Sequence, residues 1–303
     1  EYETCGTAVR GDRGVRRRVV GTLMKTLYLS DLDGTLLRPD ERVSDYTVSV
    51  LNRLAERGVV FSYATARSFA TAGEIMKECR VSNPVIVHNG AFIVDGASGQ
   101  FLHCNVLNRS EAAEIYAAFI RNGLRPIVYS VIDSRNRFSY FTSGNSKAQN
   151  DFLQTRIGEK DLFQRARVIG NDAQALDGDV FYFSCIDDPV RLERVKEALT
   201  DKYRCFYSRD IYSGEYWLEV LSKEASKAAA AQRLKKMLGC DRLVCFGDGL
   251  NDEILFSVAD ERYAVENAAT SLKKIADEVI AANTEDGVAH WLERRLLCGR
   301  KSI

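Results

Sequence analysis

The sequence predicts an α/β protein with a doubly wound, mostly parallel core sheet and an inserted α+β unit. Its 303 residues suffice for one large domain or two ordinary ones. Short apolar runs alternate with amphipathic helical patterns at both ends of the chain, as expected for buried parallel strands covered by helices. The middle of the chain has more polar, aromatic-rich strands, which indicates a sheet with one open face.

The first part of the core is expected before residue 107. Ser44 is suited to cap a helix that has apolar residues on one face, and Gly58 is suited to close it. The elements expected here are strand 26–29, helix 44–57, strand 59–64, a helix to about residue 79 and strand 85–87.

The same alternation returns late in the chain, after the more polar middle. The late elements are strand 217–221, helix 227–238, strand 242–246, helix 252–258, strand 263–265, helix 271–277, strand 278–281 and a closing helix from about 287. The elements expected in the middle are helices 110–121 and 189–200 and strands 126–131, 137–141, 180–185 and 203–207. We therefore predict a core domain of residues 24–106 and 215–303 and an inserted α+β cap of residues 107–214.

The first 23 residues have neither helical nor strand periodicity. They hold five arginines against three acidic residues, a local charge of +2. We expect this basic leader to be disordered, or to be translated sequence upstream of a start at Met24, and exclude it from the fold.

Composition excludes several classes of protein. Lys plus Arg number 42 and Asp plus Glu number 42, so there is no basic excess of the kind that binds nucleic acid or anionic membranes. No apolar run approaches the roughly 20 residues of a membrane helix. Eight scattered cysteines without a C-x-x-C pair argue against zinc and against a disulfide framework, so we expect a cytoplasmic protein. The sequence does not indicate an oligomeric state.

Two aspartates follow the first predicted strand, where parallel α/β sheets bind ligands. Asp31 and Asp33 are spaced i, i+2, and Gly34 permits a sharp turn after them. Asp, Gly and Thr are also common turn residues, so an ordinary exit from a strand is the competing interpretation.

Other polar groups are expected at the same sheet edge. They are Thr65 and the Ala66 amide after the second strand, Lys227 at a helix start, and Asp248, Asn251 and Asp252 after strand 242–246. Taken singly, each has a structural interpretation as a helix cap or a solvated lysine. Together, clustered carboxylates repel unless a cation shares them, and hard oxygen ligands suit Mg²⁺. Lysine, hydroxyl and amide groups suit phosphate oxygens, so the combination predicts phosphoryl chemistry.

The motifs also carry a family resemblance. Residues 31–36, Asp-Leu-Asp-Gly-Thr-Leu, resemble the D-x-D-x-T motif of the haloacid dehalogenase (HAD) superfamily of phosphohydrolases. Thr65, Lys227 and residues 247–252 match its second, third and fourth motifs in order. The insertion between the second and third motifs resembles a C2-type cap on a Rossmann-like core, and residues 89–91, 266–268 and 285–289 are similar to the Cof-type branch. Ala66 stands where this branch commonly has Gly, although its backbone amide remains.

The resemblance implies a role for each motif residue. Asp31 would be the nucleophile that forms an aspartyl phosphate, and Asp33 the general acid and then the general base. It further implies that Mg²⁺ is held by Asp31, Asp248 and the main-chain carbonyl of Asp33, that Asp252 orients water or Lys227, and that Lys227, Thr65, Asn251 and the Ala66 amide hold phosphate oxygens.

The expected activity is Mg²⁺-dependent hydrolysis of a small phosphorylated metabolite: a sugar phosphate, a nucleotide or a cofactor phosphate. One alternative is a phosphomutase or phosphotransferase that acts on a sugar phosphate, because the same motifs serve it. Another is a sensor that binds a phosphate ligand without turnover, although a sensor has no need of the second aspartate, Asp33.

Overall fold

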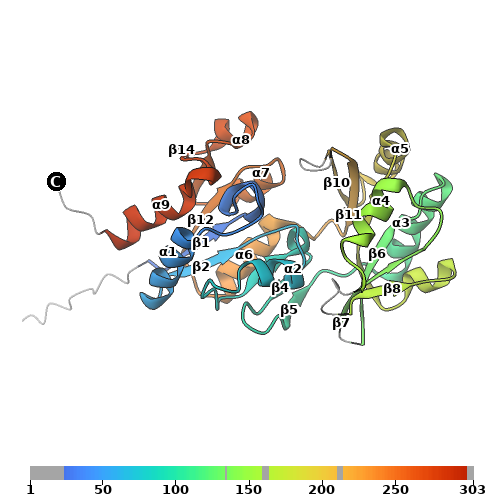
Figure 1. The fold of residues 1–303 in the computed structure, drawn as a ribbon, viewed down its shortest axis with the longest axis horizontal. Helices are drawn as coiled ribbons and strands as arrows, with labels where there is room; N and C mark the ends of the chain where they lie inside the picture. Colours follow the sequence, from blue (N-terminus) through green and yellow to red (C-terminus); the bar gives the residue numbers. More distant parts are fainter. Residues whose placement is uncertain (1–23, 134, 159–163, 210–213, 299–303) are drawn as a thin grey trace, which may run out of the picture.

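The computed structural model describes residues 24–133, 135–158, 164–209 and 214–298, which form two lobes (Figure 1). The expectation for residues 1–23 lies outside the described residues. One lobe contains both ends of the described chain, and the middle of the chain forms the other. No helix among the described residues is both long and apolar enough to cross a membrane.

The core lobe is built on a parallel sheet with strand order β14-β13-β12-β1-β2. Its strands are β1 (Thr26–Ser30), β2 (Val60–Tyr63), β12 (Arg242–Gly247), β13 (Glu261–Val265) and β14 (Glu278–Ile280). Helices lie on either side of it: α1 (Asp45–Glu56), α2 (Phe69–Ile75), α6 (Lys227–Met237), α7 (Asn251–Phe256), α8 (Thr270–Ile275) and α9 (Gly287–Leu292) (Figure 1). On one face of central β1, Leu27 and Leu29 have no exposed surface, and on the other face Tyr28 is partly buried and packs against the core beside Trp291 of α9. The predicted fold class is confirmed.

Local sequence signals explain several of these boundaries. The Ser44 hydroxyl accepts a hydrogen bond from the Thr47 amide at 3.0 Å and caps α1, as predicted. Gly58 follows the helix with φ +71°, a conformation that glycine adopts without strain. Short helical turns occur at Leu32–Leu36, His88–Gly90, Asp172–Leu176, Asn283–Glu285 and Glu293–Leu297.

A small antiparallel sheet extends the core beside β2. It has the order β3-β4-β5, formed by β3 (Val85–Val87), β4 (Phe92–Val94) and β5 (Phe101–Cys104). A single parallel bridge between Ala64 and Ile86 joins it to the end of β2. We predicted β3 but not β4 or β5, whose short runs have little pattern of their own.

The cap lobe is a sheet with strand order β10-β11-β9-β6-β7-β8. The strands are β6 (Ile127–Ile132), β7 (Arg135–Tyr140), β8 (Ala166–Val168), β9 (Asp179–Ile186), β10 (Arg204–Arg209) and β11 (Tyr216–Leu221), and the helices are α3 (Arg109–Arg121), α4 (Lys147–Gln154) and α5 (Pro189–Leu199). Phe119 of α3 and Leu192 of α5 pack against Phe183 and Leu218 and cover one face. This is the α+β unit that the sequence predicts.

Strand β11 corrects the predicted boundary at residue 215. We expected strand 217–221 in the parallel core sheet, but it pairs antiparallel with β9 and β10 in the cap. The reason is that apolar and polar side chains alternate along β11. Leu218 and Val220 face the helices of the cap, whereas the side chain of Glu219, between them in sequence, lies on the other face. A strand that places a carboxylate on one face does not fit a core sheet covered on both faces. The core therefore resumes after Leu221.

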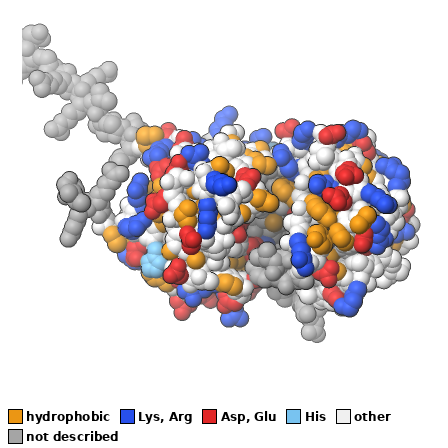
Figure 2. All heavy atoms as spheres, turned by 90° about the horizontal axis from the view of Figure 1, so that it is seen from above, with side chains coloured by type: hydrophobic (Ala, Val, Ile, Leu, Met, Phe, Trp, Pro, Cys, Tyr) orange, Lys and Arg blue, Asp and Glu red, His pale blue; other side chains and the backbone are white. Residues whose placement is uncertain are grey.

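The open face of the cap sheet meets the core around His88. The buried His88 ring lies 5.2 Å from the Phe181 ring and 5.6 Å from the Tyr182 ring of the cap. Its Nε2 lies 3.1 Å from Nδ2 of Asn136 in β7. In the space-filling view an indentation separates the two lobes (Figure 2).

Candidate active site

The nucleophile candidate stands where two neighbouring core strands end. The Asp31 amide donates to the carbonyl of Phe246 at 3.0 Å, which ties the end of β1 to the end of β12. Asp248 follows β12, and its Oδ1 accepts a hydrogen bond of 3.0 Å from the Thr35 hydroxyl. Between Asp31 and Thr35 the chain turns at Gly34, whose φ of +75° suits glycine. A Cβ at Gly34 would overlap the Asp248 carboxylate, so this position needs glycine for space as well.

Lys227 lies between two of the carboxylates. It is the first residue of α6, and its Nζ donates to Asp31 Oδ1 at 2.6 Å and to Asp252 Oδ1 at 2.8 Å. The Lys227 side chain is only 2% exposed. A buried ammonium at a helix start opposes the helix dipole, so its carboxylate partners explain its position. Lys227 is therefore not a solvated surface lysine.

Asp252 already has partners for both of its oxygens. Oδ1 accepts from Lys227, and Oδ2 accepts from the amides of Asp248 and Gly249 at 3.1 Å each. Asp252 has no exposed surface. It ties the loop after β12 to Lys227, as a residue that orients its neighbours would.

The carboxylates crowd one another electrostatically. Burial raises the pKa of Asp31 well above its usual range, Asp252 and Asp248 raise it further, and Lys227 opposes them. Burial and Asp252 raise the pKa of Asp248 to about 6. The carboxylates outweigh burial in raising the pKa of Lys227. One lysine thus does not neutralise the cluster.

This cluster is suited to a metal ion. Asp31, Asp248 and Asp252 each offer a carboxylate oxygen, and these atoms lie within 4.8 Å of one another. The donors are all hard oxygens. Burial, together with the neighbouring carboxylates, raises the pKa of Asp31 and of Asp248, and a divalent cation would relieve the repulsion between the carboxylates. The residues present therefore fit a metal ion.

Asp33 pairs with an arginine that the sequence motifs do not assign to the site. Arg67 Nη2 donates to Asp33 Oδ1 at 2.6 Å and Arg67 Nε donates to Oδ2 at 2.8 Å, a two-pronged pair. The same Nη2 donates to Glu41 Oε2 at 2.7 Å. Nothing local in the sequence indicates this pairing, because 34 residues separate Arg67 from Asp33.

The expected phosphate-binding groups lie on the loops around the same edge. Thr65 follows β2, is fully buried, and its hydroxyl accepts the Arg67 amide at 3.0 Å. Ala66 and Asn251 are partly exposed, the first beside Thr65 and the second at the start of α7. The end of β2 is fixed next to β1, because the Ala64 amide donates to the Ser30 carbonyl at 2.9 Å.

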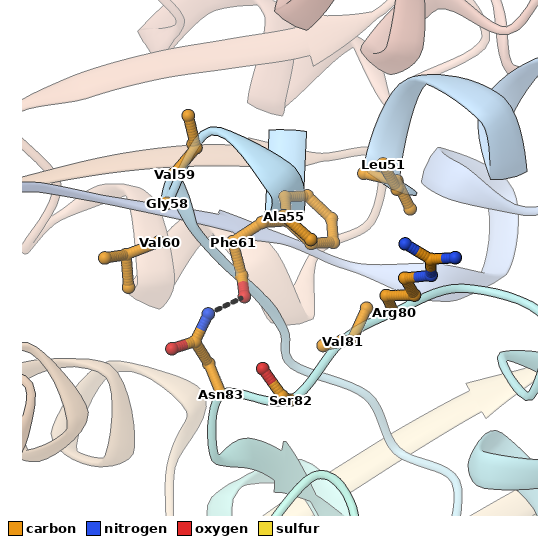
Figure 3. A pocket seen from close by; sticks show the side chains of 10 residues that line it. All are labelled: Leu51, Ala55, Gly58, Val59, Val60, Phe61, Arg80, Val81, Ser82 and Asn83. Atoms are coloured by element: carbon orange, nitrogen blue, oxygen red, sulfur yellow. Dashed lines mark hydrogen bonds between the residues drawn. The ribbon is translucent and has the colours of Figure 1, made fainter. Parts of the chain in front are cut away.

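A surface hollow of about 140 Å³ lies away from this site, at the start of β2 (Figure 3). Arg80 at its rim pairs with Glu56 at 3.0 Å, and Asn83 Nδ2 donates to the Phe61 carbonyl at 3.0 Å. Parallel α/β sheets bind ligands at the opposite, carboxyl ends of their strands. We therefore take the carboxylate cluster as the candidate site.

Known proteins resemble this chain over most of its length. The family model for haloacid dehalogenase-like hydrolases matches residues 28–292. A putative phosphatase of Buchnera aphidicola subsp. Baizongia pistaciae is 28% identical over 280 residues, which cover 89% of this chain and 98% of that protein. Phosphatase YwpJ of Bacillus subtilis is 27% identical over 292 residues, covering 89% of this chain and 99% of its own. A haloacid dehalogenase-like hydrolase from Bacteroides thetaiotaomicron superposes with a TM-score of 0.73 at 24% identity, over 89% of this chain and 99% of that one.

The chain belongs to the haloacid dehalogenase-like hydrolase family. Within that family it is an enzyme of the phosphatase class, the class named for its curated relatives. The resemblance read from the sequence motifs is thereby confirmed.

Proposed function

We propose that this enzyme hydrolyses a small phosphorylated metabolite, with Mg²⁺ as its cofactor and an aspartyl phosphate on Asp31 as its intermediate. The observation that carries the proposal is the cluster of Asp31, Asp248 and Asp252, of which Asp31 and Asp252 pair with the buried Lys227. A carboxylate beside a buried cation, at the carboxyl edge of a parallel sheet, is placed to attack a phosphorus atom.

Mg²⁺ would be held by the carboxylates of Asp31 and Asp248 and by the main-chain carbonyl of Asp33. When bound, it supplies positive charge that lets an anionic nucleophile approach an anionic phosphate. We leave Asp252 out of the ligand set because its two oxygens serve Lys227 and the loop amides. Its role would be to orient Lys227.

The reaction would proceed in two halves. Asp31 forms a bond to phosphorus while the bond to the leaving oxygen breaks, and Asp33 gives that oxygen a proton. Water then forms a bond to phosphorus while the Asp31–phosphorus bond breaks, and Asp33 takes the proton of the water. Phosphate oxygens would be held by Lys227, Thr65, Asn251 and the Ala66 amide, which stabilise developing charge.

We propose a small phosphate ester as the substrate: a sugar phosphate, a nucleotide or a cofactor phosphate. Two relatives support this class by name, an HMP-PP phosphatase of Serratia proteamaculans and the 5-amino-6-(5-phospho-D-ribitylamino)uracil phosphatase YwtE of Bacillus subtilis. The cap would be of the C2 type and hold the leaving group. A cytoplasmic location and the lack of nucleic-acid or membrane partners remain predictions from composition.

The test is phosphate release from a panel of phosphorylated sugars, nucleotides and cofactors. We expect turnover with Mg²⁺, loss of turnover in excess chelator, and its return when Mg²⁺ is restored. Asp31→Asn should abolish release, while Asp151→Asn, at an exposed position of α4, should not. Undiminished release by Asp31→Asn would refute the nucleophile. A sugar-phosphate isomer formed without free phosphate would instead indicate a mutase, and binding without release anywhere in the panel a sensor.

A further inference from the structure

Arg67 makes contacts that the proposed reaction has so far not used. The Arg67 side chain is 15% exposed, and its guanidinium binds both oxygens of the Asp33 carboxylate and also binds Glu41. Asp33 is the group to which we assign proton transfer. The one arginine is thus shared between that residue and a second carboxylate.

The backbone of Arg67 is fixed from two directions. Its amide donates to the Thr65 hydroxyl at 3.0 Å, and its carbonyl accepts from the His88 amide at 3.0 Å. Thr65 and His88 are both buried. The guanidinium therefore extends from an anchored point beside the expected phosphate-binding loop.

Asp33, by contrast, lies on a tight turn and is more open to solvent. Its side chain is 30% exposed, and the next residue, Gly34, has φ +75°. An exposed carboxylate on a turn has free rotamers, and a bidentate guanidinium restricts both its position and its plane. A lysine at position 67 would supply the positive charge but not the two coplanar N–H donors that bind both carboxylate oxygens.

The cap reaches the same corner of the core. Arg165 Nη1 of the cap donates to the hydroxyl of Ser68, the neighbour of Arg67, at 2.8 Å. Burial lowers the pKa of Arg156, and the charge of Arg67 lowers it further, so this second cap arginine lies within electrostatic range. A leaving group held under the cap would therefore lie near the Asp33–Arg67 pair.

We propose that Arg67 is the positioning residue for Asp33 and that Glu41, the second acceptor of Arg67 Nη2, holds the guanidinium in place. The inference rests on the proposed function. Arg67 exchanges no proton: Asp33 gives its proton as the phosphorus–oxygen bond of the ester breaks and regains one from water as the phosphorus–Asp31 bond breaks. Arg67 acts only on where the Asp33 carboxylate stands at those two moments.

The test compares two esters of similar shape, phenyl phosphate and 4-nitrophenyl phosphate. The phenol released in the first turnover, with enzyme in excess and Mg²⁺ present, reports only the first half of the reaction. Phenol needs a proton to leave, whereas nitrophenol leaves readily without one. Loss of a positioned general acid should therefore slow the cleavage of phenyl phosphate far more than the cleavage of 4-nitrophenyl phosphate.

We expect Arg67→Met to slow the release of phenol from phenyl phosphate about 10- to 100-fold, because misplacing a catalytic group by 1 Å can reduce a rate ~10²-fold. The release of nitrophenol from 4-nitrophenyl phosphate should slow only a few-fold. Arg67→Lys should fall between Arg67→Met and the wild type, and Glu41→Gln should show a weaker shift in the same direction. Arg262→Met removes another two-pronged arginine–aspartate pair, at the start of β13, and should leave the ratio of the two rates unchanged.

Two results would overturn the inference. If Arg67→Met slows the cleavage of both esters equally and lowers the unfolding temperature, Arg67 has only a structural role. If Arg67→Met changes neither cleavage rate, Arg67 has no role in the reaction. Asp33→Asn separates this inference from the proposed function. If Asp33→Asn shifts the ratio and Arg67→Met does not, only the role of Arg67 falls. If Asp33→Asn leaves the ratio unchanged, the proton-transfer step of the proposed function and this inference fall together.

Discussion

Replacing Lys227 by Met is the sharpest perturbation of the site. The Lys227 side chain is 2% exposed, and its ammonium lies 2.6 Å from Asp31 and 2.8 Å from Asp252. The change therefore leaves two buried carboxylates without their cation. Removing one partner of a buried ion pair costs about 3–5 kcal/mol, because the remaining charge is uncompensated. At about 2–4 °C per kcal/mol for a domain of this size, the unfolding temperature should fall by roughly 6–20 °C.

The assay is thermal unfolding followed by circular dichroism in excess chelator, with Lys235→Met as the matched control. Lys235 is in the same helix, but its pair with Asp260 at 3.0 Å is partly exposed and should contribute about 0–1 kcal/mol. Adding Asp252→Asn to Lys227→Met should restore part of the loss, since it removes one orphaned carboxylate. If Lys227→Met and Lys235→Met unfold at the same temperature, the electrostatic account of the site is wrong.

Two further predictions concern the surroundings of the site. Gly34→Ala should cost about 1–2 kcal/mol through its φ of +75° and reduce turnover about 10²-fold, because the added Cβ displaces the Asp248 carboxylate. Gly58→Ala, with φ +71° and open space around its Cβ, should show the stability loss alone, and equal turnover of the two variants would contradict this. Asp286 accepts hydrogen bonds from Arg38, Ser44 and Thr47, which outweigh burial and lower its pKa. Asp286→Asn should therefore lower the free energy of unfolding by about 1.5–3 kcal/mol at neutral pH. Because the folded pKa is depressed, this difference should persist above about pH 4 and shrink as pH falls further, and a difference that grows in acid would refute it.

The parallel core was predictable because its strands and helices have strong local patterns. Strand β1 reads as an apolar run, and Ser44 marks the start of α1 by its own chemistry. Local patterns do not predict the sheet to which a strand belongs, because the strands that pair with it lie far away in the sequence. Strand β11 is apolar enough for either sheet, and only Glu219 on its open face indicated the cap.

The candidate site was predictable from motif residues that follow strand ends, which topology gathers at one edge. Lys227 and Asp252 meet Asp31 as that reasoning requires. The pairing of Arg67 with Asp33 and Glu41 was not predictable, because arginine after a strand has no preferred partner until the fold brings one near. Side-chain contacts across loops depend on tertiary structure that local patterns do not contain.

The order of strands in the core also has a consequence for biogenesis. Strand β1 lies between β2, which follows it closely, and β12, which comes after the whole cap. Lys227 follows Asp31 by 196 residues. While the protein is being synthesised, the nucleophile candidate therefore leaves the ribosome long before its lysine, and one edge of β1 has no neighbour during that interval. Such late, long-range pairing slows folding and exposes strand edges to other chains. A nascent chain that stops within the cap therefore contains a central strand with one unpaired edge, and it lacks Lys227.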